Sequence, residues 1–369
     1  MTTRRSFIKD TAAAAGVIFT SCGLLDAAPA RAQAKPTKSR LPVLVKGKRV
    51  RTIDVHAHCL IPEAVALLPP EEVKSSQIYP PVKGSKQFDI VLDERLAGMD
   101  AQGVDIEVLS INPWWYRRER ELVEKIIQIQ NEGLAALCAK QPDRLMAFAS
   151  LALQFPDLAV KQLEDAVRKY GLKGAAIGGS VASVDFSEPQ FHPVWAKAEE
   201  LGVTLFIHPQ STPELSKRFK GNGWLANVIG NPLDTTIALQ HLIFEGVFDK
   251  FPRLKVCAAH GGGYLGSYAP RSDHGCFVSP QNCNPDIVLK KKPTEYLNQI
   301  FFDALVFTPE ALRHLVAQVG ASQVVMGTDH PIPWEEHPVD HIMATRTLTD
   351  AQKIAILSGN AAKLLGMKV

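Results

Sequence analysis

The segment Ile53-Asp54-Val55-His56-Ala57-His58 is a short apolar run that ends in two histidines two residues apart. Side chains in a strand alternate between its two faces, so a strand here would direct His56 and His58 to the same side. Two imidazoles that converge from one strand end make half of a metal site. A pair of ordinary histidines in a half-buried strand has the same pattern, so the rest of the chain must supply further ligands before a metal site is inferred.

Strand-like and helix-like segments alternate along most of the chain. The predicted strands cover 52–58, 104–111, 145–151, 174–178, 203–208, 254–260, 300–304 and 323–329. The predicted helices cover 93–102, 119–140, 157–170, 190–201, 232–248, 309–319 and 350–365. Eight short buried strands that alternate with helices predict an α/β protein with a distorted (β/α)₈ TIM barrel. A doubly wound open sheet is the alternative, but no glycine-rich phosphate-binding turn follows a strand.

We expect one domain from residue 51 to residue 369, with long loops at the C-terminal mouth of the barrel. The proline-rich stretch 59–88 is the main candidate for such a loop, and a loop of this length usually serves a function. Residues 35–50 are basic and contain proline, and they are expected to form an extended N-terminal arm.

His208, His260 and Asp329 end later predicted strands in the same way that His56 and His58 end the first. The C-terminal ends of barrel strands meet at one mouth, where the active sites of this fold lie. One such residue is unremarkable in a core, but five on four strands are hard to obtain by accident. Three imidazoles and one carboxylate suit Zn²⁺, with Mn²⁺, Co²⁺ or Fe²⁺ as alternatives. We therefore predict that His56, His58, His208 and Asp329 bind the metal, and that His260 is free for catalysis.

The motifs around these residues resemble those of the amidohydrolase superfamily, in the branch of aminocarboxymuconate-semialdehyde decarboxylase and the aromatic-acid decarboxylases. The resemblance runs from about Arg51 to about Gly366. Besides segment 53–58, it rests on Phe206-Ile207-His208-Pro209, Ala259-His260-Gly261-Gly262-Gly263 and Gly327-Thr328-Asp329-His330-Pro331. It implies a zinc site with the ligands named above and His260 as the catalytic acid and base. Binuclear relatives need a lysine at the end of the fourth strand, which here ends in Ile177-Gly178-Gly179-Ser180, so we expect one ion.

Four further residues are candidates for substrate binding. Arg271 lies where the decarboxylase branch places an arginine that reaches into the neighbouring subunit's site, which implies a homodimer. Gln210 stands where the family decarboxylase has a tryptophan, and the family's second substrate-binding arginine has no clear counterpart. Trp115, within Trp114-Trp115-Tyr116-Arg117-Arg118, could stack an aromatic ring beside an arginine that pairs with a carboxylate. His330 follows the predicted ligand of the eighth strand and could line the pocket.

Three functions are compatible with these residues. We expect a metal-dependent carboxy-lyase that removes carbon dioxide from an aromatic or unsaturated carboxylic acid, with metal-bound water and His260 delivering the proton and Asp329 in the catalytic group. A metal-dependent hydrolase of an amide, lactone or carbon–carbon bond would use the same residues, with His260 as a base. A non-catalytic binding protein of the cell envelope is the third, but it would have no need for His260 beside a complete ligand set.

The composition excludes two other classes. The chain has 369 residues, of which 46% are hydrophobic and 21% charged, and its net charge is only +3. A nucleic-acid-binding protein would carry a stronger basic excess. No apolar run in the mature chain is long enough to span a membrane, so we expect no stable membrane insertion once the signal is removed.

Residues 1–34 have the pattern of a bacterial export signal. Thr3-Arg4-Arg5-Ser6-Phe7-Ile8-Lys9 is a twin-arginine motif, and an apolar stretch and small residues suited to cleavage follow it. We expect export to the periplasm by the twin-arginine route, with lipid anchoring at Cys22 as a less favoured alternative. Cys276 and Cys283 flank a short loop and could pair in that oxidising compartment.

Overall fold

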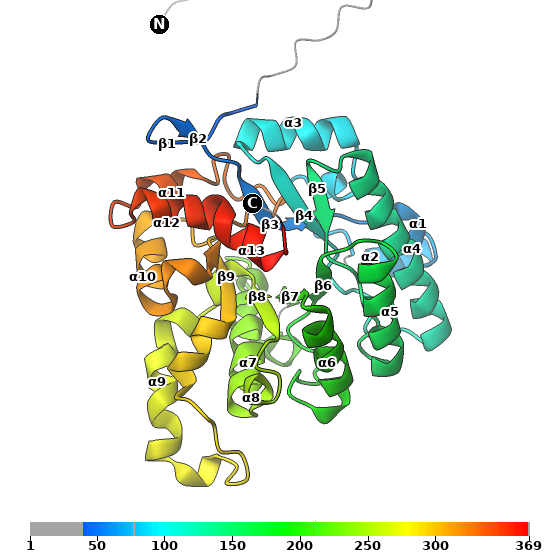
Figure 1. The fold of residues 1–369 in the computed structure, drawn as a ribbon. Coiled ribbons are helices and arrows are strands. Elements are labelled where there is room, and N and C mark those ends of the chain that lie inside the picture. Colours follow the sequence, from blue (N-terminus) through cyan, green and yellow to red (C-terminus); the bar gives the residue numbers. More distant parts are fainter. Residues whose placement is uncertain (1–39, 77, 211, 368–369) are drawn as a thin grey trace, which may run out of the picture. The chain divides into compact units, whose positions relative to one another are not determined.

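Eight parallel strands form the centre of the molecule (Figure 1). The computed structural model describes residues 40–76, 78–210 and 212–367. The strands are β3 (Ile53–His58), β4 (Ile106–Ser110), β5 (Leu145–Ala147), β6 (Gly174–Ile177), β7 (Thr204–Ile207), β8 (Lys255–Ala258), β9 (Ile300–Asp303) and β10 (Val324–Val325). Strands β3 to β5 pair in chain order, as do β6 to β10. Parallel bridges between Ala149 and Ala175 and between Ala57 and His330 join the two groups, which confirms the predicted barrel.

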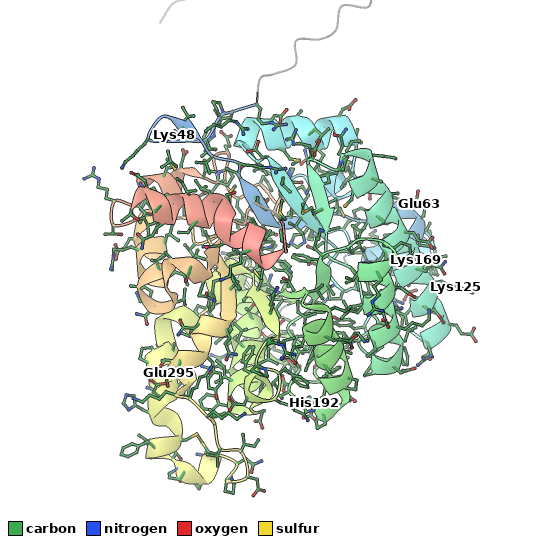
Figure 2. The ribbon with its side chains drawn as sticks, viewed as in Figure 1. Lys48, Glu63, Lys125, Lys169, His192 and Glu295 are labelled. Atoms are coloured by element: carbon green, nitrogen blue, oxygen red, sulfur yellow. A yellow bond between two sulfur atoms is a disulfide. The ribbon has the colours of Figure 1, made fainter. Side chains whose placement is uncertain are left out.

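Helices surround this barrel and connect its strands. They are α1 (Pro62–Val65), α2 (Pro70–Ser75), α3 (Leu92–Gln102), α4 (Arg120–Lys140), α5 (Pro156–Arg168), α6 (His192–Leu201), α7 (Asn231–Phe244), α8 (Val247–Lys250), α9 (Leu265–Val278), α10 (Pro309–Val319), α11 (Asp340–Ala344), α12 (Asp350–Ile354) and α13 (Asn360–Leu364). The shorter 3₁₀ and π turns are η1 (Ser85–Phe88), η2 (Pro189–Phe191), η3 (Pro213–Leu215), η4 (Ala226–Gly230), η5 (His260–Gly262), η6 (Pro280–Asn282), η7 (Pro293–Gln299), η8 (Ala321–Gln323) and η9 (Ala355–Gly359). Charged side chains such as Glu63 on α1 and Lys125 on α4 are exposed on the outside (Figure 2).

The core has two parts that the strands separate. A larger apolar cluster lies between the strands and the outer helices, and a smaller one collects inward-facing residues of several strands together with α13. Val55 and Phe206 belong to the inner cluster, and the ring of His56 packs edge-on against Phe206. The pairing of β3 with β4 has a register irregularity between Asp54 and Ala57. Such irregularities often redirect side chains beside active sites.

Two predictions about loops need correction. Stretch 59–88 is not a continuous loop, because it contains α1, α2 and η1. Residues 40–50 are not an extended arm, because β1 (Leu44–Val45) and β2 (Lys48–Arg49) pair as an antiparallel hairpin. The hairpin turn at Lys46 and Gly47 has positive φ at both residues, which is the backbone that a tight two-residue turn requires. Buried valines on either side of the hairpin hold it against the barrel.

The structure also bears on the predicted disulfide and on membrane-spanning helices. Cys276, near the end of α9, forms a disulfide with Cys283, as the sequence allowed. Within the described ranges, no helix combines the length and the apolar character needed to cross a membrane. The predicted export signal at 1–34, with Cys22, and the first part of the predicted arm lie outside the described residues.

Candidate metal centre and active site

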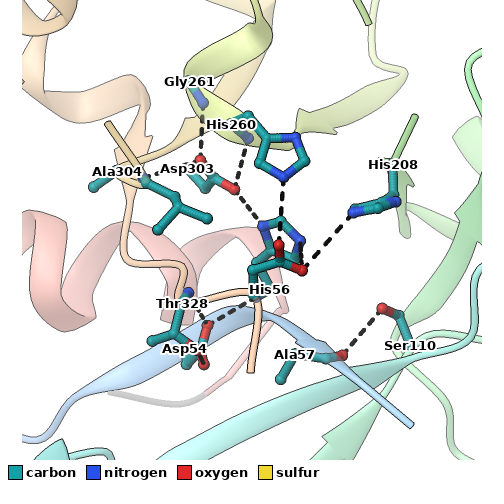
Figure 3. A network of polar contacts seen from close by, with 12 residues as sticks. Asp54, His56, Ala57, Ser110, His208, His260, Gly261, Asp303, Ala304 and Thr328 are labelled. Carbon is teal, nitrogen blue, oxygen red and sulfur yellow. Dashed lines mark hydrogen bonds and ion pairs between the residues drawn. The ribbon is translucent and has the colours of Figure 1, made fainter. Parts of the chain in front are cut away.

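Five side chains from the ends of four strands meet at the C-terminal mouth of the barrel. His56 and His58 end β3, while His208, His260 and Asp329 follow β7, β8 and β10. Figure 3 shows the rings of His56, His208 and His260 directed towards one another from separate strands. His56, His58, His208 and Asp329 are all buried, and each offers one ligand atom within 4.8 Å of the others. The structure therefore brings the four predicted ligands together.

One oxygen of Asp329 faces the histidines. Its Oδ1 atom lies 2.9 Å from Nε2 of His58 and 3.2 Å from Nε2 of His56. The corresponding distance to Nε2 of His208 is 4.0 Å. The Nε2 atoms of His56 and His58 are themselves only 3.1 Å apart. Nitrogen lone pairs and a carboxylate oxygen thus converge on one small volume.

A divalent cation fits this donor set. Among the described residues, both ring nitrogens of His208 are buried and have no hydrogen-bond partner. A buried polar atom without a partner is unusual and calls for an explanation such as an ion. Burial, together with the neighbouring His58 and His56, holds the pKa of His208 well below its ordinary value, which leaves the ring neutral. Neutral imidazole is the form that binds a metal, and three imidazoles with one carboxylate suit a first-row divalent ion.

His260 lies beside the four predicted ligands but does not belong to that group. Its Nε2 atom is 3.7 Å from Oδ2 of Asp329, and its ring centroid is 5.2 Å from that of His208. The backbone of His260 has a φ of 54°, in the left-handed region that residues other than glycine rarely adopt. Strained backbone of this kind concentrates at functional sites. His260 is therefore held next to the other oxygen of the carboxylate, as a separate acid or base requires.

Asp303, at the end of β9, contacts two of these histidines and was not among the predicted site residues. Its Oδ2 atom lies 2.6 Å from Nδ1 of His56 and accepts a hydrogen bond from the backbone N–H of His260 at 2.9 Å. Its Oδ1 atom accepts the N–H of Gly261 at 2.9 Å (Figure 3). A carboxylate on Nδ1 directs Nε2 of His56 to the metal position and makes it more basic. A carboxylate at the C-terminal end of a predicted barrel strand is a signal that could have identified it.

A second buried network supports the other side of the site. Glu107 on β4 pairs with Arg95 at 2.6 Å and with Nδ1 of His330 at 2.7 Å. Arg95 also donates to the backbone carbonyl of His58 at 3.0 Å. Burial opposes ionisation of Glu107, but the Arg95 guanidinium and the contact with His330 hold the pKa of Glu107 below its ordinary value. This network fixes the end of β3, and neither Arg95 nor Glu107 was among the predicted site residues.

A cavity of about 820 Å³ opens above the metal ligands. His58, His208 and Asp329 are among its lining residues, which places the ligand cluster against open space. Its aromatic and basic lining residues are Phe88, Trp114, Tyr116, Trp224, Arg117 and Arg118. Arg118 forms an ion pair with Glu72. The cavity therefore offers flat apolar surfaces and a basic rim close to the buried donors.

The predicted substrate-binding residues divide into two groups. Gln210 lines the cavity, and its backbone N–H donates to Asp234 at 2.9 Å. Trp115 does not, because it is fully buried and its indole N–H donates to the carbonyl of Leu151 at 2.8 Å. Its neighbours in sequence, Trp114 and Tyr116, take that place.

His330 and Arg271 also lie outside the described cavity lining. The ring of His330 is turned towards Glu107 because the buried carboxylate attracts it. Arg271 is exposed on α9, so any role in substrate binding needs the partner subunit that the resemblance implies. His58, His208 and Asp329 are the metal ligands that line the cavity directly.

Comparison with known proteins agrees with this geometry. The amidohydrolase family profile matches residues 53–367, so the chain belongs to the amidohydrolase family. A 2-amino-3-carboxymuconate-6-semialdehyde decarboxylase from Dictyostelium discoideum is 32% identical, over 74% of this chain and 76% of that protein. A gamma-resorcylate decarboxylase from Rhizobium radiobacter is 30% identical, over 74% of this chain and 86% of its own length. The solved structure of a 2,6-dihydroxybenzoate decarboxylase with 2,6-dihydroxybenzoate matches with a TM-score of 0.74 and 27% identity, covering 86% of this chain and 100% of that one.

Proposed function

We propose that this protein is a metal-dependent, non-oxidative decarboxylase of an aromatic or unsaturated carboxylic acid. The observation that carries the proposal is the buried group of three imidazoles and Asp329, which faces a large cavity and has His260 beside it. The named relatives act as decarboxylases on acids of this kind, and they support the choice of reaction.

The residues of the site have different roles in the proposed reaction. A divalent ion held by the four ligands would act as a Lewis acid towards an oxygen of the substrate. Trp114 and Tyr116 line the cavity and provide flat surfaces for a planar acid. His260 and Asp329 form the acid–base pair of this proposal, with Nε2 of His260 3.7 Å from Oδ2 of Asp329.

The reaction needs one proton and no oxidant. The proton moves from the pair of His260 and Asp329 to the carbon that bears the carboxylate, and a new carbon–hydrogen bond forms. The carbon–carbon bond to the carboxylate then breaks, its electron pair returns to the π system, and carbon dioxide leaves. A positioned acid of this kind typically contributes about 10²–10⁴-fold to the rate.

His260→Ala tests the assignment of roles. We expect about one metal ion per chain to remain bound, while carbon dioxide release falls by about 10²–10⁴-fold. Metal content is measured by elemental analysis of the purified protein, and turnover by carbon dioxide release from a panel of aromatic and muconate-type acids. Loss of the metal in this variant would show that His260 is a ligand. His314→Ala is the matched control, because this histidine lies on the outer helix α10.

The unmodified enzyme tests the reaction itself. Stoichiometric metal without carbon dioxide release from any acid of the panel would contradict decarboxylation and favour hydrolysis of amides or lactones. Zinc is the ion we propose, because zinc binds both imidazole nitrogen and carboxylate oxygen. Reconstitution of the metal-free protein with zinc, manganese, cobalt or iron(II), followed by rate measurements, identifies the ion that supports turnover.

Two further parts of the proposal concern the surroundings of the enzyme. We propose a homodimer in which Arg271 on α9 binds a substrate carboxylate in the site of the other subunit. Arg271→Ala should then raise KM while leaving metal content unchanged, and sedimentation would show the mass of two chains. We also propose that residues 1–34 direct export by the twin-arginine route to the periplasm. Replacement of Arg4 and Arg5 by lysine should retain the protein inside the cell.

A further inference from the structure

Trp334 connects Asp329 to the edge of the cavity. Its indole Nε1 donates a hydrogen bond to Oδ2 of Asp329 at 2.7 Å. The indole of Trp224 stacks on Trp334, with ring centroids 5.8 Å apart and an angle of 22° between the planes. Trp224 lines the cavity and is 43% exposed. A continuous set of contacts therefore runs from the cavity wall to the carboxylate.

The two oxygens of Asp329 face different partners. Oδ1 lies closest to Nε2 of His58 and His56, whereas Oδ2 faces His260 and accepts the indole N–H. The terminal torsion of an aspartate is broad and roughly two-fold, so the side chain alone does not distinguish its oxygens. Indole is only a donor, and its hydrogen bond to a carboxylate is strengthened by the charge. Trp334 thus provides the directional contact that separates the two oxygens.

Trp334 is itself held from two sides. Besides the stack with Trp224, the ring of Phe307 meets it edge-on, with centroids 5.7 Å apart. Trp224 and Phe307 have φ values of 51° and 67°, and Asp329 has a φ of 64°. Left-handed backbone is rare in bulky residues and costs free energy, so the surrounding contacts must hold it in place. The strained backbone therefore belongs to Trp224 and Phe307, which hold the indole, and to Asp329, which accepts its N–H.

We propose that Trp334 is a positioning residue for Asp329. Its N–H holds Oδ2 towards His260 and leaves Oδ1 to the metal ion, while Trp224 and Phe307 keep the indole in place. The kinetic consequence rests on the proposed decarboxylase function, in which Asp329 and His260 act together on the proton that the reaction uses. The consequence for metal binding rests only on Asp329 as a ligand.

Trp334→Phe tests this role, because phenylalanine keeps an aromatic ring and lacks the N–H. We expect kcat to fall by about 10–100-fold, the range typical of residues that orient metal ligands, with KM within about twofold of the parent. We also expect a fixed concentration of chelator to remove the metal about tenfold faster, since Asp329 is free to turn. A kcat within twofold of the parent, with unchanged metal release, would overturn the proposal.

Trp195→Phe is the matched control. Trp195 on α6 also donates its indole N–H, to the carbonyl of Phe186 at 2.9 Å, but it lies in the core away from the site. This variant should keep kcat and the rate of metal release, and an equal loss in both variants would overturn the specific role of Trp334. Phe307→Leu is a second route if Trp334→Phe does not fold. It loosens the indole without removing the N–H, so a smaller decrease in kcat is expected, and no decrease would contradict the proposal.

The measurements separate this inference from the proposed function. If the unmodified enzyme releases no carbon dioxide from any acid, the proposed function fails. Metal release from Trp334→Phe and Phe307→Leu still decides the role of Trp334 in that case. If the unmodified enzyme is active and Trp334→Phe matches it in both measurements, the inference fails and the function stands.

Discussion

At the N-terminal end of the barrel, Asp105 is as buried as Asp329 is at the opposite end, with exposed fractions of 3% and 4%, but their surroundings differ in kind. Asp105 has cationic partners on one oxygen, where Arg40 lies 2.9 Å away and Arg49 also pairs. Its other oxygen accepts the backbone N–H of Thr52 at 2.9 Å. Each oxygen of this carboxylate therefore has its partners within the chain.

At the mouth, one carboxylate faces four imidazoles and the pairing is incomplete. Asp329 approaches His58 and His56 closely, but the ring nitrogens of His208 have no hydrogen-bond partner among the described residues. Burial opposes ionisation of both carboxylates, and in both cases the neighbouring donors overcome it and lower the pKa. The two ends thus share burial and an anionic carboxylate. What marks the functional end is that imidazole nitrogens without hydrogen-bond partners lie beside other possible metal ligands, which is where an ion fits.

Removal of one such donor should have the largest effect. In His208→Ala the ligand group loses a neutral imidazole, and three donors bind a divalent ion much more weakly than four. We expect metal content to fall well below one ion per chain and carbon dioxide release to fall by more than about 100-fold. Elemental analysis and rate measurements on the same sample check both.

His241→Ala is the control for that experiment. This histidine lies on α7 with a 40% exposed side chain, and it pairs with Asp185 at 3.4 Å, away from the ligand group. It should keep both metal and activity. Full metal occupancy in His208→Ala would show that His208 is not a ligand. The unpartnered nitrogens of His208 would then no longer distinguish the mouth of the barrel from its other end.

Asp303→Asn should have an intermediate effect. The amide still accepts hydrogen bonds from the backbone, but it no longer provides a charge for Nδ1 of His56, which lies 2.6 Å from Oδ2. Carboxylates in this position typically change metal affinity or activity by about 10–100-fold. Competition with a chelator measures the affinity, and kcat gives the activity. Values within twofold of the parent would mean that Asp303 only supports the fold of the mouth.

The strands and the metal ligands could be predicted from the sequence because both depend on the order of residues over short stretches of the chain. Apolar runs of strand length alternate with helical spacing, and His56, His208 and Asp329 occupy the ends of such runs. In a parallel barrel those ends must meet, so strand position alone predicts their proximity. Helix α9 was missed because Gly266, Pro270 and Gly275 weaken its helical pattern, and contacts with neighbouring elements hold it.

The residues around the metal ligands and the cavity could not be predicted in the same way. Arg95 lies on a predicted helix where a charged residue is normally expected to face water, yet it is buried against Glu107. Trp115 and Trp114 are adjacent and chemically equal, and only the loop conformation decides which one faces the cavity. The partners of such residues depend on side-chain direction after the barrel closes, and a linear pattern does not contain that direction.

Asp105→Asn should have the smallest effect on activity and acts on stability instead. The amide cannot pair with Arg40 and Arg49, and these arginines are partly exposed, so water replaces part of the loss. We expect the free energy of unfolding to fall by about 1–3 kcal/mol at pH 7, with kcat/KM unchanged.

The pKa of Asp105 is below its ordinary value in the folded protein, so its ion pairs stabilise the fold above the pKa of the unfolded chain, about 3.9. This contribution is lost as the pH falls through the lower, folded value, and the difference between parent and variant should narrow between about pH 5 and pH 2. Denaturant unfolding at several pH values measures that difference. Asp157→Asn, which removes an exposed ion pair with Arg120, should leave the unfolding midpoint unchanged. A difference that stays constant down to pH 2 would show that Asp105 stabilises the barrel through packing and not through its charge.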